Sequence, residues 1–383
     1  MDYFKESLKL HEKHRGKIEV TSKVPLKNHD DLSLAYTPGV AEPCKKIFEN
    51  PKDIYKYTNK GNSIAVVTDG SAVLGLGNIG GAAGLPVMEG KALLFKEFGG
   101  VDAYPICLDT QDTEEIIRTV QLIAPGFGGI NLEDISAPRC FEIEQRLIKL
   151  LDIPVFHDDQ HGTAIVVLAG AINALKLTGR SFDKIRIAIN GLGAAGTAVT
   201  KLLIKYGVDP KHIHLCDSKG ILYKGRGDLN SSKKELADIV NKIEVIKGGL
   251  AEAVEGADMF IGLSKPRLLT QEMVKSMAKD PIIFAMANPE PEIMPDLAKK
   301  AGARIVATGR SDYPNQVNNA LAFPGVFRGV LDAGIRKITD EIKILAAETI
   351  AGLVENPTPE KFMPDPLDKN VAKKVAEAIV KMS

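Results

Sequence analysis

Two pairs of adjacent acidic residues are the first candidates for chemistry in this chain. Glu133 and Asp134 follow a short apolar run at residues 129–132, and Asp158 and Asp159 follow another at 155–156. Ligands gather beyond the carboxyl ends of parallel strands, so we expect both pairs in turns that face one crevice. Carboxylates gathered without basic neighbours repel one another, and a divalent cation relieves that repulsion. Ligation by oxygen alone suits Mg²⁺ or Mn²⁺ better than zinc.

A structural role explains the same acids. Asp158 or Asp159 can cap a helix that begins near His161, because aspartate is a preferred N-cap residue. His157 and His161 are spaced for a zinc pair, but His157 lies at the predicted strand end. The residues alone leave the metal site and the helix cap as equal alternatives.

Lys91 and Tyr36 are the candidate acid–base groups. Lys91 lies in a predicted helix at 86–98, and the apolar residues that follow it indicate a partly inward position. In a dry cleft beside a metal its pKa is lowered, which makes a lysine a base near neutral pH. The alternative is a surface lysine whose stem covers apolar side chains. Tyr36 precedes a Pro-Gly turn, which holds the phenol at a fixed angle or simply packs it.

Three asparagines are candidates for binding a carboxylate or the amide of a nicotinamide. Asn288 follows a predicted strand end in AMANP, and Asn318 and Asn319 precede AFPGVFRG. Asparagine is also a common turn former, so these positions carry a structural explanation as well.

A glycine-rich turn indicates a bound dinucleotide. The sequence Gly191-Leu192-Gly193-Ala194-Ala195-Gly196 joins a predicted strand at 185–189 to a predicted helix at 194–206. Gly191 permits the tight turn, Gly193 lets the backbone approach a pyrophosphate, and Gly196 allows the helix to pack closely on the strand. Ala194 and Ala195 open the helix, whose free N–H groups face the phosphates. The alternative is an ordinary glycine-rich turn.

The next predicted strand, at 213–216, is followed by Asp217. A carboxylate there accepts hydrogen bonds from the ribose hydroxyls and repels a 2′-phosphate, which favours NAD. Ser218 and Lys219 are able to bind that phosphate instead, so NADP stays open. A second series, GLGNIGG at 75–81, has no such acid after its next strand. We expect Gly75 and Gly77 to line a loop around a small anion or the nicotinamide.

The elements that position these residues alternate along the chain. Further strands are predicted at 64–68, 103–107, 259–262, 282–286 and 305–307, and further helices at 113–124, 139–151, 162–177 and 270–278, with more helices after 330. This pattern predicts an α/β fold with two domains, 1–155 and 156–383, the second a doubly wound Rossmann-type dinucleotide-binding domain. The C-terminal helices either stay with the second domain or pack back on the first.

Composition excludes several classes of protein. The 383 residues are 44% hydrophobic and 26% charged, with a formal net charge of zero, so no global field attracts nucleic acid or an anionic membrane. The four cysteines are widely spaced, which is typical of reduced thiols, and the charged N-terminus does not look like a secretory signal. We expect a cytoplasmic enzyme that forms a homodimer or larger homo-oligomer.

Taken together, the motifs resemble those of the malic enzymes, in family order over nearly the whole chain, and the length resembles the small bacterial and archaeal branch. The motifs are YTPGVA (36–41), TDGSAVLGLGNIG (68–80), EGKALLF (89–95), NLEDI (131–135), FHDDQHGTA (156–164), FAMANP (284–289) and NNALAFPG (318–325).

The resemblance implies specific roles. Glu133, Asp134 and Asp159 are then the ligands of Mg²⁺ or Mn²⁺. Lys91 is the general base that binds the substrate, with Asp158 as its partner, and Tyr36 is the acid. The contacts to the substrate carboxylate and the nicotinamide are implied for Asn288 and Asn319, with Asn318 adjacent.

The implied reaction is the oxidative decarboxylation of L-malate to pyruvate and CO₂ with NAD(P)⁺, and oxaloacetate is a second expected substrate. One departure concerns Ala72, where larger family members carry an arginine that suits a malate carboxylate. Backbone N–H groups of the GLGNIGG loop are our candidates to replace it. The alternatives are malolactic conversion to lactate with retained NAD, a metal-free amino-acid dehydrogenase, and a non-catalytic nucleotide sensor.

Overall fold

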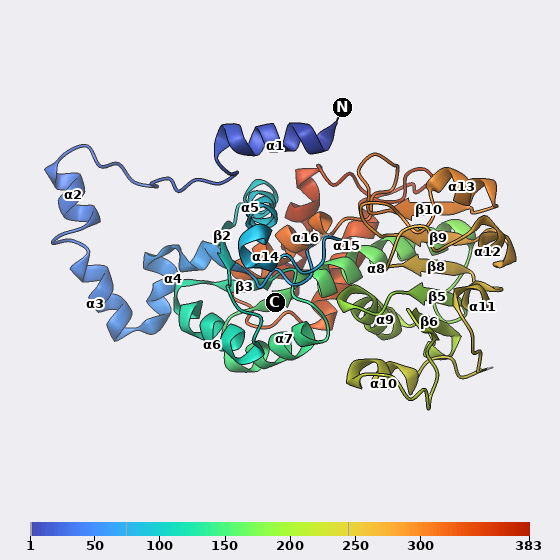
Figure 1. Cartoon of the computed structure of the whole chain (residues 1–383). Helices are drawn as coiled ribbons and strands as arrows, with labels where there is room; N and C mark the ends of the chain where they lie inside the picture. Colours follow the sequence, from blue (N-terminus) through green and yellow to red (C-terminus); the bar gives the residue numbers. More distant parts are fainter. Residues whose placement is uncertain (1, 74, 244) are drawn as a thin grey trace.

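The chain folds around two sheets that lie side by side, as the computed structural model shows for residues 2–73, 75–243 and 245–383 (Figure 1). The elements up to the end of the first sheet are α1 (Tyr3–His14), α2 (His29–Ala35), α3 (Ala41–Glu49), η1 (Pro51–Asp53), α4 (Ile54–Tyr57), η2 (Asn59–Asn62), β1 (Ser63–Thr68), α5 (Gly80–Gly99), β2 (Asp102–Cys107), α6 (Thr113–Ile123), η3 (Ala124–Gly126), β3 (Gly129–Leu132), α7 (Arg139–Leu150) and β4 (Val155–His157).

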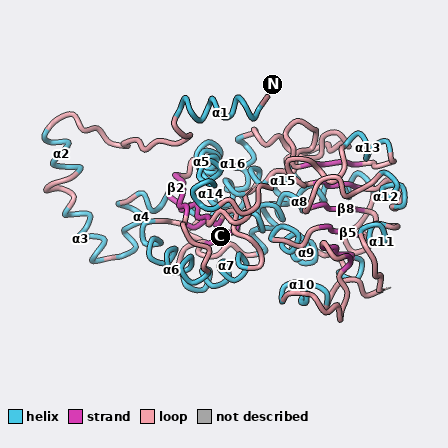
Figure 2. The backbone as a smooth tube through the Cα atoms, in the orientation of Figure 1, coloured by secondary structure: helices cyan, strands magenta, loops and turns pink. Residues whose placement is uncertain are grey.

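The remaining elements are α8 (Asp158–Thr178), β5 (Ile187–Asn190), α9 (Ala194–Tyr206), η4 (Pro210–His212), β6 (Ile213–Asp217), β7 (Gly220–Ile221), α10 (Ser231–Ala237), α11 (Leu250–Val254), β8 (Met259–Gly262), α12 (Gln271–Ser276), β9 (Ile282–Ala285), α13 (Pro295–Lys300), β10 (Ile305–Thr308), η5 (Asn319–Leu321), α14 (Phe323–Asp332), α15 (Asp340–Gly352) and α16 (Lys369–Met382). Figure 2 shows how helices alternate with the two sets of strands. The predicted α/β class is confirmed.

The first sheet is parallel, with strand order β2-β1-β3-β4. Every residue of β1 and β3 is buried, as expected for a parallel sheet that is covered on both faces. Alternate residues of β1 point to opposite sides: Ile64 and Val66 pack with Phe95 of α5, whereas Ala65 and Val67 pack with the apolar faces of α6 and α7.

The second sheet has the order β10-β9-β8-β5-β6-β7, parallel except for the short β7 at its edge. Helices α8 and α9 pack on one face, and α11, α12 and α13 pack on the other, so the sheet is doubly wound. The chain passes from β5 to β6 on one side and later returns to β8 on the other. The carboxyl end of β5 is therefore the switch point where such sheets bind ligands, and the glycine turn follows it directly.

The C-terminal helices pack back toward the first sheet. Phe323 of α14 lies 4.6 Å from Phe95 of α5 between ring centroids, and Phe327 lies 5.3 Å from the same ring. Helix α16 packs on α14 and α5, whereas α15 packs on α8. The last helices thus share the core of the first sheet, and the division at residue 155 stays a prediction.

Two helices begin earlier than the sequence predicts, and both changes affect the site. Helix α5 begins at Gly80 because its first turns lie against neighbouring backbone; a Cβ on Gly81 would stand 2.4 Å from the carbonyl of Leu108. This close packing outweighs the poor helix propensity of glycine. Helix α8 begins at Asp158, directly after β4, with two aspartates in its first turn, where the helix dipole favours negative charge.

Helix α8 also forms the central core helix between the two sheets. It is the one described helix that is long and apolar enough to cross a membrane, but 72% of its most apolar window is buried inside the protein. We therefore interpret it as a core helix.

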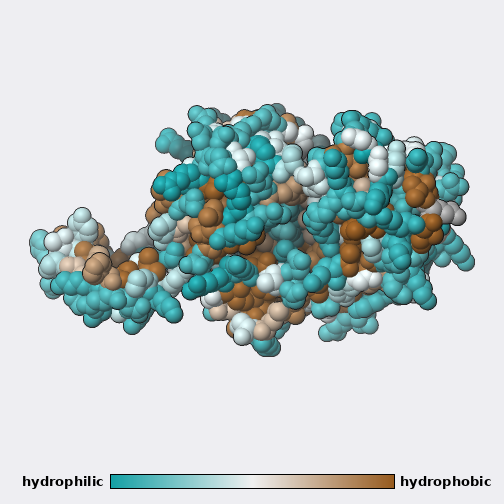
Figure 3. All heavy atoms as spheres, turned by 90° about the horizontal axis from the view of Figure 1, so that it is seen from below, coloured by the Kyte–Doolittle hydropathy of each residue, from teal (hydrophilic) through white to brown (hydrophobic). Residues whose placement is uncertain are grey.

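The segment 28–50, which we call the N-terminal arm, stands apart from the body of the molecule (Figures 1 and 3). Its helices α2 and α3 have no buried residue. Several large apolar side chains of the arm face solvent in the single chain, with exposed fractions from 37% to 90%: Leu32, Leu34, Tyr36, Val40 and Phe48. Exposed apolar surface is common at sites of interaction with another surface.

Candidate active site

Three carboxylates converge where the first sheet ends. Glu133 and Asp134 follow β3, and Asp159 lies in the first turn of α8; one carboxylate oxygen from each lies within 4.8 Å of the others. Glu133 and Asp134 are almost completely buried. The backbone N–H of Asp134 donates to Asp159 Oδ2 at 2.8 Å, which ties the two loops together. Asp134 has φ of +54°, a conformation that costs energy outside glycine and occurs often at functional sites.

The helix-cap interpretation of the second acidic pair is wrong. Asp158 and Asp159 are the first two residues of α8 rather than turn residues, and the N-cap is His157, whose side chain makes no cap hydrogen bond. The carboxylates instead point to Lys91 and to the carboxylate cluster. Three converging carboxylates, two of them buried, offer the oxygen ligands that suit a divalent cation of the Mg²⁺ or Mn²⁺ type.

Lys91 lies against this cluster as a buried group, with 7% of its surface exposed. Its Nζ donates to Asp158 Oδ2 at 2.6 Å and lies 2.9 Å from Glu133 Oε1. The ammonium also lies 4.2 Å from the centre of the Phe323 ring. Lys91 shares one face of α5 with Phe95, which is four residues on and packs in the core. The surface-lysine alternative is therefore excluded.

The pKa values within this group follow from burial and charge. Burial raises the pKa of Glu133 well above its usual range, and the carboxylates of Asp159, Asp158 and Asp134 raise it further. Burial likewise raises the pKa of Asp158. For Lys91 burial acts to lower the pKa, but Asp158 and Glu133 outweigh it and raise the pKa. The predicted lowering of the lysine pKa depends on a bound metal; in the arrangement seen here two carboxylates contact the ammonium and raise its pKa.

The asparagines occupy different positions. Asn319 donates through Nδ2 to Asp158 Oδ2, so it joins the Lys91 group. Asn318 accepts from the Ala320 backbone N–H at 2.9 Å and caps a short 3₁₀ helix, which is the turn-forming role. Asn288 is exposed at the end of β9, and its side chain lies next to Gly309.

The loop at 75–81 meets the Asn288 segment. Gly75 has φ of +76°, and a Cβ there would stand 2.7 Å from the carbonyl oxygen of Asn288. The backbone N–H groups of Leu76 and Gly77 donate to Val73, and those of Ile79 and Gly80 donate to Gly70. These four amides are therefore engaged within the loop, which leaves few of them to bind a second substrate carboxylate.

The residue that precedes Ala72 makes a different set of contacts. Ser71 accepts from Arg139 Nη2 at 3.0 Å and donates to Asp69, which in turn lies 2.8 Å from the Arg139 guanidinium. The Ala72 backbone N–H donates to the carbonyl of Asp134 at 3.0 Å. The segment that contains Ser71 and Ala72 therefore holds the loop of Asp134 in place through backbone and side-chain hydrogen bonds.

The glycine turn after β5 has the geometry of a phosphate cradle. Gly191 has φ of +104°, and a Cβ on it would stand 2.5 Å from the Leu263 carbonyl. A Cβ on Gly196 would stand 1.8 Å from the carbonyl oxygen of Gly191, so only glycine permits this helix–strand contact. A Cβ on Gly193 would meet nothing within 4 Å, so this side of the turn is open. Ala194 packs against the core of the first sheet, so the glycine turn lies beside that sheet.

Asp217 ends β6 as predicted but has partners that the sequence did not indicate. Arg226 Nη2 donates to both of its carboxylate oxygens at 2.8 and 2.9 Å, and Lys233 Nζ donates to Oδ2 at 2.6 Å. Ser218 is exposed beside it.

Tyr36 does not join the site within one chain. It lies at the end of α2 on the N-terminal arm with 67% of its surface exposed, well separated from α5 and α8 (Figure 1). The expected packing in a rigid turn is therefore absent for this side chain.

Glu144 is a site residue that sequence reasoning missed. Its carboxylate accepts from the backbone N–H of His157 at 2.8 Å and from Gln160, and lies 3.0 Å from Nε2 of His161. Burial acts to raise the pKa of Glu144, but His161 and His157 lower it to about 2. These bonds hold the first turn of α8, which carries Asp158 and Asp159. The sequence did carry one signal for Glu144. It is an acidic residue on the same buried face of α7 as the apolar residues Cys140, Ile143 and Leu147.

Asn131 is a second missed residue. It lies in β3, two positions before Glu133, which directly follows the strand, and its Nδ2 donates to Glu133 Oε2 at 2.8 Å. With Lys91 on the other oxygen, both oxygens of Glu133 are held in place.

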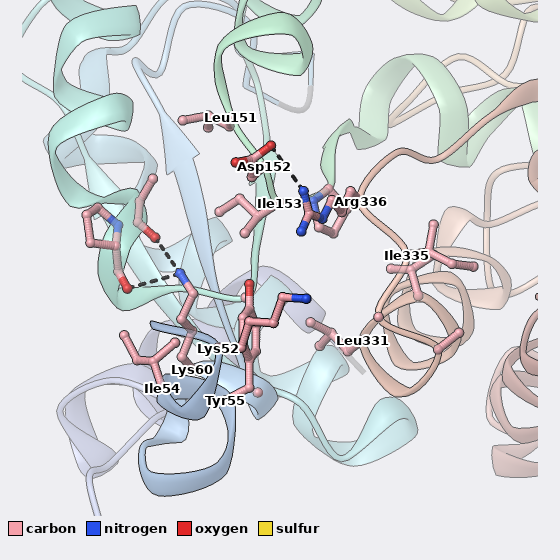
Figure 4. Close-up of a pocket in the computed structure, with 18 of the residues that line it drawn as sticks. Lys52, Ile54, Tyr55, Lys60, Leu151, Asp152, Ile153, Leu331, Ile335 and Arg336 are labelled. Carbon is pink, nitrogen blue, oxygen red and sulfur yellow. Dashed lines mark hydrogen bonds and ion pairs between the residues drawn. The ribbon is translucent and has the colours of Figure 1, made fainter. Parts of the chain in front are cut away.

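A cavity of about 950 Å³ lies at the root of the arm, between α4, η3 and the α14–α15 connection (Figure 4). Lys60 extends along its wall and donates to the carbonyls of Ala124 and Pro125, and Arg336 faces Asp152 at 3.5 Å. None of the described residues that line it belongs to the predicted site, so we do not assign it to the chemistry.

Comparisons with known proteins agree with this geometry. Residues 15–148 match the family model of the malic enzyme N-terminal domain, and residues 160–383 match that of the malic enzyme NAD-binding domain. The chain is 58% identical to the bifunctional malic/malolactic enzyme of Bacillus subtilis over 100% of this chain and 93% of that protein, and 55% identical to the NAD-dependent malic enzyme of Geobacillus stearothermophilus over 95% and 76%.

Among solved structures, the malic enzyme from Pyrococcus horikoshii superimposes with a TM-score of 0.95 at 51% identity, over 99% of this chain and 90% of that one. The relatives cover both sheets, and the two family models cover all of the chain from residue 15 except 149–159. The chain therefore belongs to the malic enzyme family.

Proposed function

We propose that this chain oxidises L-malate and decarboxylates it to pyruvate and CO₂ while it reduces NAD⁺ or NADP⁺. The observation that carries the proposal is the buried lysine between two carboxylates, Asp158 and Glu133, beside a three-carboxylate cluster. A metal-free amino-acid dehydrogenase has no use for that cluster, and a nucleotide sensor has no use for the lysine.

Two bound groups supply chemistry that side chains lack. The glycine turn would hold a nicotinamide dinucleotide, which would supply a hydride acceptor for the oxidation of malate at C2. Glu133, Asp134 and Asp159 would hold a Mg²⁺ or Mn²⁺ ion, which would supply a Lewis acid. The residues fit both groups, because the turn is open at Gly193 and the three carboxylates converge.

Lys91 is the base in this proposal. A metal bound by Glu133 would remove one of the two carboxylates that raise the pKa of Lys91 in the present arrangement. The neutral amine then takes the proton of the C2 hydroxyl as the hydride leaves C2. Asp158 and Asn319 hold the amine in place through their mutual contact. Asn288 and Asn319 are the amides that we propose for the substrate carboxylates and the nicotinamide.

Tyr36 is the proposed acid for the second step. Loss of the C4 carboxylate as CO₂ leaves the electron pair in the enolate of pyruvate, and a proton from the phenol at C3 completes the product. Because Tyr36 lies on the exposed arm, we propose a homodimer in which the arm of one subunit brings Tyr36 to the site of its partner. The exposed apolar side chains of the arm support this assembly, since a dimer buries them.

The experiment that tests the function is a steady-state assay of the purified chain with L-malate. We expect reduction of NAD(P)⁺ that requires Mn²⁺ or Mg²⁺ and stops with EDTA. Turnover that is unchanged by EDTA, or that requires an amino acid and ammonia in place of malate, would contradict the proposal.

Metal binding should also stabilise the fold in a pH-dependent way. Glu133 and Asp158 have raised pKa values in the folded state, so the folded protein binds more protons than the unfolded chain and metal-free stability falls as pH rises through those values. Mn²⁺ needs the ionised carboxylates, so its effect runs the other way. At a fixed concentration of ~100 times its Kd at pH 8, Mn²⁺ should raise Tm by on the order of 3 °C at pH 8 and by much less at pH 5.5, where its Kd is higher.

Differential scanning fluorimetry with two variants checks this result. Asp159→Asn should lose the Mn²⁺ shift at pH 8, whereas Asp152→Asn, which removes an exposed acid far from the cluster, should keep it. An equal shift at both pH values, or a shift retained by Asp159→Asn, would contradict the metal assignment.

We also propose a cytoplasmic location with malate as the small-molecule partner and no nucleic acid or membrane partner. The four cysteines are free thiols, as expected in a reducing compartment.

A further inference from the structure

The carboxylate of Asp217 has no hydrogen-bonding capacity left for a ribose. A carboxylate offers about four lone-pair positions. Oδ1 accepts from the backbone N–H of Lys219 at 2.9 Å and from Arg226 at 2.8 Å, and Oδ2 accepts from Arg226 at 2.9 Å and from Lys233 at 2.6 Å. All four positions are filled by this chain's own donors.

The same contacts make the net charge of the side-chain cluster at the end of β6 positive, although Asp217 alone is negative. Asp217 and Asp228 contribute two negative charges, whereas Lys219, Arg226 and Lys233 contribute three positive ones, linked by ion pairs from 2.6 to 3.1 Å. The side chains of Asp217 and Arg226 are 7% and 8% exposed, so this pair is fixed. Lys233 is 22% exposed and uses one of its three N–H donors on Asp217, which leaves donors that reach solvent.

We propose that this cluster selects NADP⁺: Lys233, with Lys219 and Ser218, binds the 2′-phosphate, and Asp217 acts as a positioning residue that holds Lys233 and Arg226. The inference rests on the proposed function, because it assigns the dinucleotide of the same site. It also reverses the expectation from Asp217 alone, since an acid that is covered by two cations no longer repels a phosphate.

The chemistry discriminates between the two dinucleotides. A ribose 2′-hydroxyl has to displace Arg226 or Lys233 to reach the carboxylate, which replaces a hydrogen bond between two opposite charges with one from an uncharged donor. A 2′-phosphate leaves the carboxylate's bonds intact and adds contacts to the free donors of Lys233 and to the Ser218 hydroxyl. Selectivity thus comes from Lys233, although the strand-end acid is the residue usually associated with NAD.

The test measures binding by isothermal titration calorimetry, without malate or metal, so that it does not depend on turnover. Wild-type protein should bind NADP⁺ more tightly than NAD⁺, and adenosine 2′,5′-bisphosphate more tightly than ADP. Lys233→Ala should weaken NADP⁺ by at least ~10-fold, the scale of one lost charged hydrogen bond, and leave NAD⁺ within about twofold. Lys234→Ala, an exposed lysine on the same helix, should change neither.

Three results would overturn the proposal: tighter binding of NAD⁺ by the wild type, equal weakening of both dinucleotides by Lys233→Ala, or an equal effect of Lys234→Ala. If Lys233→Ala does not fold, the comparison of the bisphosphate with ADP on the wild-type protein still decides. Selective NADP⁺ binding without malate turnover would contradict the proposed reaction and leave this inference intact. Binding of neither dinucleotide would contradict both.

Discussion

Replacement of Lys91 by alanine should lower kcat for malate oxidation by about 10²- to 10⁴-fold, the range that a general base contributes. The lysine is the one described amine in contact with both Asp158 and Glu133, so no neighbouring amine can replace it. Lys91→Arg should be nearly as inactive, because a guanidinium keeps the charge but does not lose its proton. Lys91→Arg therefore distinguishes a role of Lys91 as a base, which the variant loses, from a role of its positive charge alone, which the variant keeps.

The matched control lies one turn further along the same helix. Lys96 is 59% exposed and pairs with Asp102 at the surface, so Lys96→Ala should keep kcat within about twofold of the wild type. Unchanged cofactor binding by calorimetry will show that Lys91→Ala remains folded. If Lys91→Ala or Lys91→Arg kept more than a tenth of the activity, the base would have to be another group.

Mixing two inactive variants should restore activity if Tyr36 acts across the subunit interface. Tyr36→Phe lacks the acid, and Lys91→Ala lacks the base, so each homodimer is expected to be inactive. After unfolding and refolding together, half of the dimers are mixed, and each mixed dimer has one site with both residues intact. We expect roughly a quarter of the wild-type activity.

The same experiment excludes the alternative in which the arm folds back onto its own chain. In that case every site of a mixed dimer lacks one residue, and no activity returns. Tyr57→Phe at the root of the arm is the control, because it keeps the phenol that the proposal assigns and should be active without mixing. A mixture as inactive as its components would contradict the exchange of arms.

The carboxylate site follows closely from the sequence because strand ends are local features. Glu133 and Asp158 come directly after apolar runs, and parallel pairing brings the ends of β3 and β4 side by side. The glycine turn was predictable for the same reason, since a strand, the turn and a helix are consecutive. The burial of Lys91 was indicated only by its apolar neighbours, and its two counter-ions come from other elements.

Features that depend on distant partners were not predictable. Asp217 lies 9 and 16 residues from Arg226 and Lys233, with β7 between, so the spacing alone gave no indication of a covered carboxylate. The support from Glu144 requires α7 to pack beside the start of α8. Tyr36 was expected in a rigid turn as the acid of the site, but the structure places it on the exposed N-terminal arm, apart from the carboxylate cluster.

Product stoichiometry with L-malate and Mn²⁺ tests the central claim most directly. One equivalent each of pyruvate, CO₂ and reduced NAD(P)H should appear per malate consumed, with no lactate, because the reduced cofactor leaves the site. The relative named as a malic/malolactic enzyme makes lactate the product to measure in parallel. Lactate formed with CO₂ but without net NAD(P)H at 340 nm would contradict the account and indicate malolactic conversion.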